Sequence, residues 1–398
     1  MRAVFKPVLL AFLLTTASGL TVAQPVSAAT KTASAAAQDD SVALVVKHYG
    51  NLVKASYDDT LGGALLMQKA ILAFMDKPSE EGLKTARKAW IDAREFYGQT
   101  EAFRFYAGPI DDKNGPEGRI NGWPMDESYV DYVKDAPNAG IINKKSAITK
   151  KSLAALNEKN GEENIATGWH AIEFLLWGQD LSNTGPGERS FEDFVDGKKT
   201  NADRRRLYLK TVTELLVDDL TYLAKAWVPA ASSYRTKFDR GNMESVRKMF
   251  VGLGSLSRGE LAGERIEVAL ASQAQEDEHS CFSDNTHRDV VNNAKGIRNV
   301  WLGEYRRADG TTLLGPSLRE LVAAKNAALS ESLTKQINAS VNAAESIQAP
   351  FDREIAGAKD APGRLRVQKT ADSLIQQSKG LVEAANAVGI TRLTLVAP

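Results

Sequence analysis

Apolar residues recur at helical spacing along most of the chain, and few segments show the alternation of a half-buried strand. Glu80 and Glu81 follow Pro78 and Ser79, which is typical of a helix start, because carboxylates are favourable at the positive end of the helix dipole. We therefore expect an all-α fold without a sheet of consequence. The pattern predicts helices at 41–57, 61–75, 78–107, near 127–135, 146–158, 162–177, 202–227, 242–275, 288–306, 316–348 with a break, and 361–388.

Two connections are longer than ordinary links between helices, residues 108–145 and 178–200, and both are candidate functional loops. The stretch 229–233, Pro-Ala-Ala-Ser-Ser, is the best candidate for a domain boundary. Two successive groups of long helices bury their apolar faces most simply as bundles. We expect two tandem, related bundles, each similar to a four-helix bundle, with the site near their interface. The expected domains are residues 41–228 and 229–398.

The N-terminus has the features of a secretory signal peptide over residues 1–28, with Arg2 and Lys6 before an apolar run and small residues ending at Ala28. Residues 29–40 are expected to form a flexible leader. No cysteine follows the apolar run, so a lipid anchor is not indicated. No other stretch approaches the roughly 18 apolar residues of a membrane helix. The sequence thus predicts an exported mature chain without a transmembrane segment.

Charge and cysteine content exclude several classes of protein. The chain has 50 basic and 50 acidic residues, and loss of two basic ones with residues 1–28 leaves 48 against 50, a net charge of about −2. A near-neutral chain gives no electrostatic reason to expect nucleic acid or anionic membrane as a partner. The single cysteine, Cys281, excludes an intramolecular disulfide, so the fold depends on its hydrophobic core.

The most informative segment runs from Gly168 to Gly178 and places His170 and Glu173 three residues apart in apolar sequence. Side chains at this spacing share one helix face and can share a metal ion or a proton. A core histidine paired with a glutamate is the structural alternative. Thr167 and Trp177 extend the same stripe, and ionisable groups are costly to bury unless they are paired or metal-bound. We interpret the stripe as a site.

A second constellation lies in the other half of the chain. Glu260, Glu264 and Glu267 would share one face of an α-helix near Arg265, where a solvated ion-paired surface is the alternative. The twelve residues from 276 to 287 then combine two histidines, four carboxylates and a thiol with almost nothing apolar. In this segment Glu276 and His279 are three residues apart, which repeats the spacing of His170 and Glu173 in reverse order. Asp277 follows Glu276 directly.

A third stripe in the first half carries Trp90, Arg94, Tyr97, Glu101 and Arg104 on one predicted helix face. A buried salt bridge between helices would also explain it. Together with the other two constellations, it suggests that long helices of both halves converge on one polar cleft, because ligand sites are common at domain interfaces.

These residues resemble a known family. Gly168-x-His170-x-x-Glu173 is similar to the GxHxxE signature of imelysin-like proteins. Supporting segments are Glu101–Phe105, Gly108–Asp111, Arg119–Pro124, which contains Trp123, and Glu276–His287. The resemblance covers nearly the whole mature chain and implies an all-helical fold of two related bundles. It further implies a bacterial periplasmic protein linked to iron acquisition, in a family first classed as metallopeptidases.

Three functions remain open from the sequence. The first is binding of iron or another divalent transition metal, zinc included, or of a small metal-bearing ligand, in the service of an iron-transport machinery of the envelope. Its expected metal ligands are His170, Glu173 and, as the third, Glu101. The rest of the expected cleft is lined by Trp90, Arg94, Arg104, Asp111, Trp123, Glu260, Arg265, Glu276, Asp277 and His279.

The second function is a metal-dependent peptidase in which Glu173 is the catalytic base or a zinc ligand. The chain has no HExxH or HxxEH motif, and a catalytic zinc needs three protein ligands and a water. The HxxE pair cannot supply both the ligands and a base, so we expect little or no proteolysis. The third function is a structural or adaptor protein whose polar cleft is a salt-bridge network between domains.

Overall fold

The computed structural model describes residues 26–395. The chain divides into two compact units, residues 1–40 and 41–398. Of the first unit, residues 26–40 are described, and they are helical. Most of the predicted signal peptide lies outside the described residues. The predicted division of residues 41–398 at about 228 remains a prediction.

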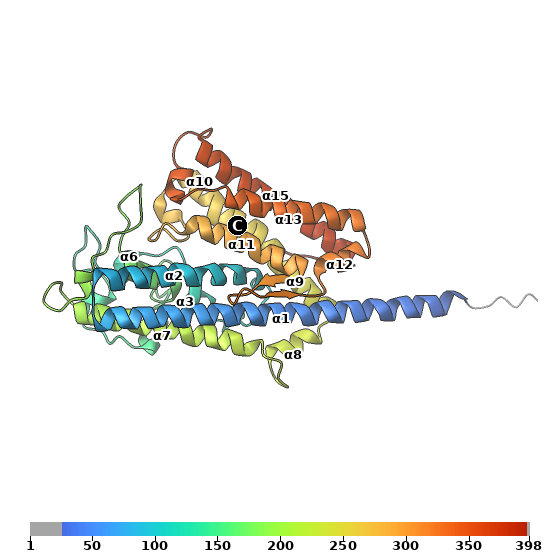
Figure 1. The fold of residues 1–398 in the computed structure, drawn as a ribbon, viewed down its shortest axis with the longest axis horizontal. Coiled ribbons are helices and arrows are strands. Elements are labelled where there is room, and N and C mark those ends of the chain that lie inside the picture. Colours follow the sequence, from blue (N-terminus) through green and yellow to red (C-terminus); the bar gives the residue numbers. More distant parts are fainter. Residues whose placement is uncertain (1–25, 396–398) are drawn as a thin grey trace, which may run out of the picture. The chain divides into compact units, whose positions relative to one another are not determined.

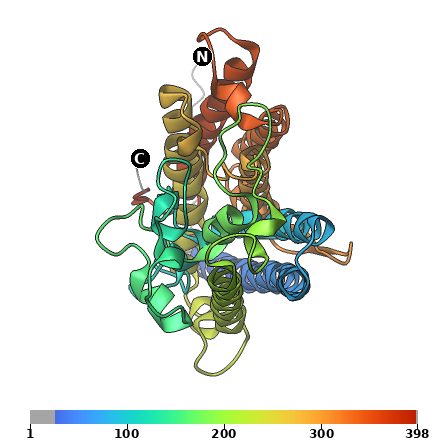
Figure 2. The same cartoon turned by 90° about the vertical axis from the view of Figure 1, so that its left-hand side faces the viewer.

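The second unit is built almost entirely from helices, as the sequence predicted. Its first half contains residues 41–76 of α1 and the long helices α2 and α7, with short helices in the connections. The bounds are α1 (Val26–Asp76), α2 (Glu80–Thr100), η1 (Glu101–Phe103), α3 (Glu117–Asn121), α4 (Glu127–Val130), η2 (Ile141–Asn143), α5 (Lys150–Leu156), α6 (Gly168–Trp177), η3 (Phe191–Phe194) and α7 (Ala202–Ala226). Figure 2 shows the teal and green connections of this half gathered in front of the helices.

The second half contains four long helical stretches and a short hairpin. Its helices are α8 (Tyr234–Asp239), α9 (Met243–Ser255), η4 (Leu256–Glu267), α10 (Val268–Ser272), η5 (Gln275–Asp277), α11 (Thr286–Leu302), α12 (Leu318–Ala323), α13 (Ala327–Glu345), α14 (Phe351–Ile355) and α15 (Pro362–Ala387). The strands β1 (Glu304–Arg306) and β2 (Thr312–Leu314) pair antiparallel. The helix that was predicted at 288–306 ends earlier, at Leu302, and is followed by Gly303, which has a φ of 65°.

One continuous helix, α1, replaces the two helices predicted at 41–57 and 61–75. Gly62 and Gly63 do not break it. A Cβ on Gly63 would lie 3.2 Å from the Cα of Ala93, so this glycine lets α1 and α2 approach closely. The leader expected at 29–40 also differs from the structure, where the helix begins at Val26; alanine-rich sequence has a high helix propensity.

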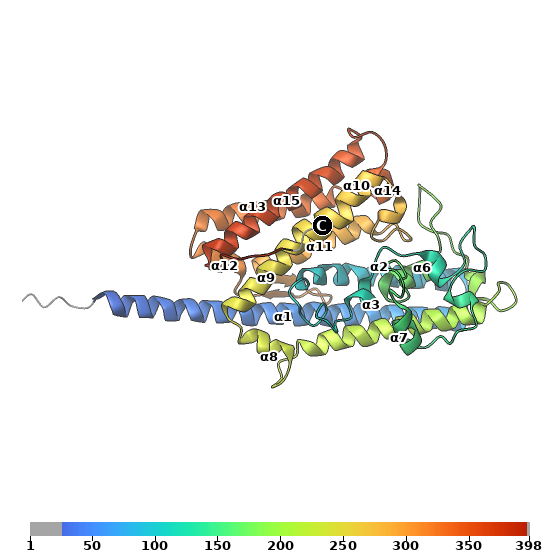
Figure 3. The same ribbon diagram turned by 180° about the vertical axis from the view of Figure 1, so that it is seen from behind.

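Helices α2 and α11 join the two halves, and α2 lies between α1 and α11 in both Figure 1 and Figure 3. Glycines permit the contact from both sides. A Cβ on Gly98 would lie 2.8 Å from the Cβ of Asn292, and one on Gly296 would lie 2.4 Å from the carbonyl oxygen of Gln99. The close contact fixes the middle of α11 against the last turn of α2, one turn beyond the predicted site residue Arg94.

The predicted helix 242–275 is a single helical stretch from 243 to 272, but its middle, η4, is π-helical. A π-helix bonds residues five apart, so it aligns different side chains from an α-helix. Glu260 and Arg265, five apart, are in contact, whereas Glu267 pairs with Arg258. The prediction that Glu260, Glu264 and Glu267 share one face is wrong for this reason.

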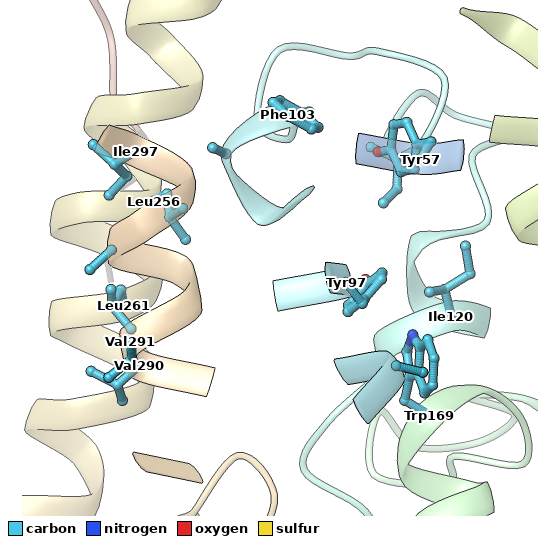
Figure 4. Packing of buried hydrophobic residues seen from close by; sticks show 14 of the residues in the cluster. Tyr57, Tyr97, Phe103, Ile120, Trp169, Leu256, Leu261, Val290, Val291 and Ile297 are labelled. Atoms are coloured by element: carbon cyan, nitrogen blue, oxygen red, sulfur yellow. The ribbon is translucent and has the colours of Figure 1, made fainter. Parts of the chain in front are cut away.

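The buried apolar residues of the described chain form a core that includes both halves. Figure 4 shows part of it, with Tyr97 and Trp169 from the first half and Leu261, Val290 and Ile297 from the second. Because the core is shared, groups from both halves can be held in fixed positions at the contact between α2, α6, α11 and the segment 276–285.

Candidate functional site

Helix α6 carries the GxHxxE motif, and the structure explains why the first residue of the motif is a glycine. Gly168 has a φ of 85°, and a Cβ there would lie 2.4 Å from the carbonyl oxygen of Ile120. L-residues with a side chain are strained in this backbone region. Gly168 thus lets the first turn of α6 pack directly on the backbone of α3, which brings His170 beside the residues that follow Ile120.

His170 and Glu173 lie on one face of α6, as their spacing predicted, and they form the buried pair that was the structural alternative. The Nδ1 of His170 lies 2.9 Å from Oε2 of Glu173, and both side chains are at most 1% exposed. The other oxygen, Oε1, accepts hydrogen bonds from the backbone N–H and the hydroxyl of Ser283, at 2.9 and 2.7 Å. Both oxygens of Glu173 are therefore occupied, while Nε2 of His170 is buried without a partner.

His279 is held in a similar way, by Asp289 of α11. Its Nδ1 lies 2.9 Å from Oδ2 of Asp289, and its Nε2 lies 3.3 Å from the amide nitrogen of Asn121. The amide oxygen of Asn121 accepts from Arg94 at 2.7 Å, so its NH₂ group faces His279. An NH₂ group can only donate, so Nε2 of His279 carries the lone pair and Nδ1 carries the hydrogen.

The two imidazoles are neighbours. Their ring centroids lie 4.8 Å apart with an interplanar angle of 66°. Burial, with Arg94 nearby, lowers the pKa of His170 well below its usual value, and burial, with Arg265 nearby, lowers the pKa of His279 to about 3. Burial raises the pKa of Glu173 to about 8 despite the bonds from Ser283. Both rings are thus neutral at neutral pH.

Arg94 forms an ion pair with Asp289, the residue that holds His279. It donates to both oxygens of Asp289, at 3.2 and 2.7 Å, and both residues are 1% exposed. The guanidinium also lies over the rings of Trp90, Tyr97 and Trp169, at 5.2 to 5.7 Å from their centroids. The charge of Arg94 is compensated by Asp289 and stabilised by the aromatic faces, so the predicted stripe on α2 supports the site.

A second charged network lies beside the imidazoles. Oε2 of Glu101 accepts from Arg104 at 2.6 Å and from Arg265 at 2.7 Å, and Arg265 also donates to Glu260 at 2.6 Å and to Asn293 at 2.7 Å. Burial alone would raise the pKa of Glu101, but the two guanidinium groups hold it well below its usual value. Glu101 is therefore a fixed anion between two cations.

A cavity of about 350 Å³ lies beside this network and is lined by Arg104, Arg265 and His279, but His170 does not line it. This volume lies in the range typical of small-molecule sites. The wall comes from both halves of the chain, as expected for a site near their interface. The lining residues are Arg104, Glu117, Asn121, Gly122, Trp123, Pro124, Glu158, Glu162, Glu260, Glu264, Arg265 and His279.

Five of the ten predicted cleft residues line the cavity: Arg104, Trp123, Glu260, Arg265 and His279. Trp90 and Arg94 lie beside Asp289 without lining it, and Asp111, Glu276 and Asp277 are elsewhere. Trp123 lines the cavity with its ring 5.7 Å from that of His279. Asp111 does not; it accepts from the backbone N–H of Phe105 and, at 2.8 Å, of Gly108, and so fixes its own loop.

Glu276 and Asp277 belong to η5, a single short turn that ends before His279. The predicted helical pair of Glu276 and His279 is therefore absent, and Asp289 is the partner of His279 instead.

The predicted metal set of His170, Glu173 and Glu101 is not preassembled. Within residues 26–395, no three His, Cys, Asp or Glu side chains are arranged to hold one metal ion. The reason is that His170 and Ser283 occupy Glu173, while Arg104 and Arg265 occupy one oxygen of Glu101.

Sequence reasoning missed Asp289, Asn121 and Ser283. Asn121 and Ser283 lie in segments that were singled out as unusual, but nothing in their spacing indicated a role. Asp289 lies three residues after Thr286 at the start of α11, and its role depends on the contact between α11 and α2, which one sequence does not reveal.

Comparison with known proteins agrees with the fold and with the family resemblance. The chain belongs to the imelysin family, whose model matches residues 53–381. Iron-regulated protein A of Synechococcus elongatus is 26% identical over 350 residues, which cover 83% of this chain and 84% of the relative.

Two solved structures share the fold. A candidate iron-regulated protein A precursor from Parabacteroides distasonis is 19% identical and superposes with a TM-score of 0.71, over 88% of this chain and 95% of its own. An imelysin-like protein from Psychrobacter arcticum is 14% identical, with a TM-score of 0.65 over 90% and 98% of the two chains. None of the helices in the described part of the chain is long and apolar enough to span a membrane.

Proposed function

We propose that this protein is a periplasmic binding component for iron acquisition that takes up a metal-bearing ligand between its two halves. The observation that carries the proposal is the pair of imidazoles of His170 and His279, each with Nδ1 on a carboxyl group and with ring centroids 4.8 Å apart.

A carboxylate on one ring nitrogen is the usual support for a histidine that ligates a metal through the other nitrogen. Both rings are neutral at neutral pH, and only a neutral imidazole can ligate. The lone pair on Nε2 of His279 accepts from Asn121, a hydrogen bond that a metal ion would displace, and Nε2 of His170 is buried without a partner among the described residues. Glu173 and Asp289 then act as positioning residues and not as ligands.

Two imidazoles fill only part of the coordination sphere of a transition metal. Since no third protein ligand completes a site within the described residues, the remaining donors would come from water or from a chelator bound with the metal. This favours a metal-bearing ligand over a bare ion. A mixed set of imidazole and oxygen donors suits iron and other borderline metals.

The link to iron and to the envelope rests on relatives and on the N-terminal sequence. The relative from Synechococcus elongatus carries the name iron-regulated protein A, and the structural neighbour from Parabacteroides distasonis is described as a precursor. Residues 1–28 have the pattern of a signal peptide. We propose export to the periplasm and delivery to an iron-transport machinery there.

The peptidase alternative has less support. A general base must reach the water or proton that it activates, and both oxygens of Glu173 are occupied by His170 and Ser283. Hydrolysis of unfolded casein by the zinc-loaded protein, abolished by chelator and by Glu173→Gln, would favour this alternative.

Titration calorimetry with ferrous ion under anaerobic conditions, and with zinc, tests the binding proposal. His170→Ala and His279→Ala should each weaken binding by at least the 10- to 100-fold that loss of a second-shell partner typically costs. His287→Ala is the matched control, because this half-buried histidine hydrogen-bonds to the carbonyl of Asp284 and does not line the cavity. Wild-type affinity in both test variants would mean that the motif is structural.

A further inference from the structure

Helix α1 presents an apolar stripe to solvent between residues 58 and 76. Leu65, Leu66 and Leu72 are 46%, 68% and 40% exposed, whereas Met67 and Ile71 of the same helix belong to the core. A single exposed leucine is normal on a protein surface, but exposed leucines gathered on one helix face indicate contact with another molecule.

A glycine in the same stripe is not explained by any contact inside the described chain. Gly62 lies in the interior of α1, where a glycine lowers the stability of the helix. Its neighbour Gly63 packs on Ala93, but a Cβ on Gly62 would meet no described atom outside its own helix within 4 Å. The missing side chain leaves room on the outer surface for a side chain from another molecule.

The stripe has the spacing of a coiled-coil seam, in which one helix packs along another. Its members follow one another at intervals of four and three residues: Asp58, Gly62, Leu65, Lys69, Leu72 and Asp76. Asp58 is paired with Lys54 of its own helix at 2.5 Å. Lys69 is exposed and forms no ion pair with a residue of the described chain.

The charges in the stripe complement the same stripe in antiparallel orientation. In a parallel pair in register, Lys69 would face Lys69 of the other copy and Asp58 would face Asp58. In an antiparallel pair centred just after residue 63, Asp58 of each copy lies opposite Lys69 of the other, and Leu65 lies over Gly62. Charged pairs along a helix seam determine its orientation and register, so the pattern favours a second copy of this chain.

We propose that this face of α1 is the interface of a two-fold symmetric homodimer. Each contact in such an interface occurs twice: Leu65 of one copy fills the space above Gly62 of the other, and Asp58 pairs with Lys69. No described residue of α1 lines the cavity beside His279. The interface is therefore distinct from the proposed ligand site.

Analytical ultracentrifugation of the mature chain at roughly 1 to 100 µM measures this association and covers homodimers of moderate affinity. Leu65→Gln should weaken the dimer at least about ten-fold, because the substitution removes an apolar contact twice from a symmetric interface. Leu365→Gln is the matched control, since Leu365 lies on helix α15 and is 53% exposed. It should leave the association unchanged.

A charge exchange tests the register. Asp58→Lys and Lys69→Asp should each weaken self-association, because each variant places like charges opposite one another. An equimolar mixture of the two variants should form a heterodimer, in which both pairs again have opposite charges. A role of these residues within one chain cannot produce this rescue, and circular dichroism checks that both variants fold.

Gly62→Gln separates the interface from the stability of the chain. Glutamine is a better helix former than glycine, and no described atom outside α1 lies near the new side chain. The melting temperature should therefore not fall, while the dimer should dissociate more readily because Leu65 of the other copy loses its space.

The remaining outcomes count against the proposal. A monomer over the whole concentration range would overturn it, and so would a dimer that Leu65→Gln and the charge variants leave unchanged, because such a dimer uses another face. A monomer that binds vesicles of phosphatidylethanolamine and phosphatidylglycerol, and loses this binding in Leu65→Gln, would show that the face contacts a membrane instead.

Discussion

Glu173→Gln should disable His170 without disturbing the fold, because it fixes the wrong tautomer of the ring. The backbone N–H and hydroxyl of Ser283 both donate to Oε1 of Glu173. In the Glu173→Gln variant, the two donors of Ser283 require that the side-chain amide oxygen takes the position of Oε1. The amide NH₂ group then faces Nδ1 of His170, which lies 2.9 Å from Oε2 in the wild type. Nδ1 must become the acceptor, and the ring hydrogen moves to Nε2, where it blocks metal binding.

The wild type differs because Glu173 can give up its proton. With a pKa of about 8, removal of that proton at pH 7 costs about one pKa unit, or about 1.4 kcal/mol. Glutamine has no such proton to release. We therefore expect a loss of roughly 10- to 100-fold in affinity for ferrous or zinc ion, the range for a lost second-shell partner. Thermal stability should not fall, since the buried carboxyl is replaced by an isosteric amide.

Calorimetry at pH 7 with each ion measures the affinity, and circular dichroism measures the melting temperature. Asn121→Ala serves as a comparison: it removes the hydrogen bond to Nε2 of His279 and leaves the tautomer of His170 unchanged. If Glu173→Gln binds metal as tightly as the wild type, Nε2 of His170 is not a ligand and the tautomer argument is refuted.

Three other predictions concern stability. Burial, with Asp180 and Asp352 nearby, raises the pKa of Asp284 to about 7, so the folded state keeps a proton that the unfolded state releases near pH 4, and the stability of the fold falls as the pH rises from about 4 to 7. Asp284→Asn should therefore have a higher melting temperature than the wild type at pH 8 but not at pH 4. Equal melting temperatures at pH 8 would refute this. Gly168→Ala should cost about 2 kcal/mol or more in urea unfolding, because of its φ of 85°; an unchanged midpoint would contradict the packing on α3. Asp131→Asn should cost about 3–5 kcal/mol, since Asp131 pairs with buried Arg189 and Arg205; a loss below 1 kcal/mol would mean that this network is weak.

The sequence predicted the helices because their apolar spacing is local information. It also predicted that His170 and Glu173 share one helix face, since residues three apart on a helix are neighbours, and left their direct hydrogen bond as the structural alternative. The proximity of His170 to the 276–287 segment, inferred from the reversed spacing of Glu276 and His279, is confirmed. The inference was right about the location, although Glu276 itself is not the partner of His279.

What the sequence did not predict depends on tertiary contacts. Asp289 reaches His279 across a turn of irregular backbone, and this contact exists only because α11 packs on α2 through Gly98 and Gly296. The occupied oxygens of Glu173 follow from Ser283, which belongs to the other half of the chain. A metal set chosen from residue types alone therefore included a carboxylate that has no free oxygen.

The π-helical register of η4 makes the site sensitive to chain length in a way that no substitution reveals. In an α-helix each residue advances by about 100°, so deleting a residue between Leu256 and Glu267 would shift part of this segment toward α-helical bonding and turn Arg265 away from Glu101. Family members that lack one residue here would then retain the fold and the GxHxxE motif but lose a cavity wall. Alignment gaps in this segment would therefore mark members whose cavity has a different wall.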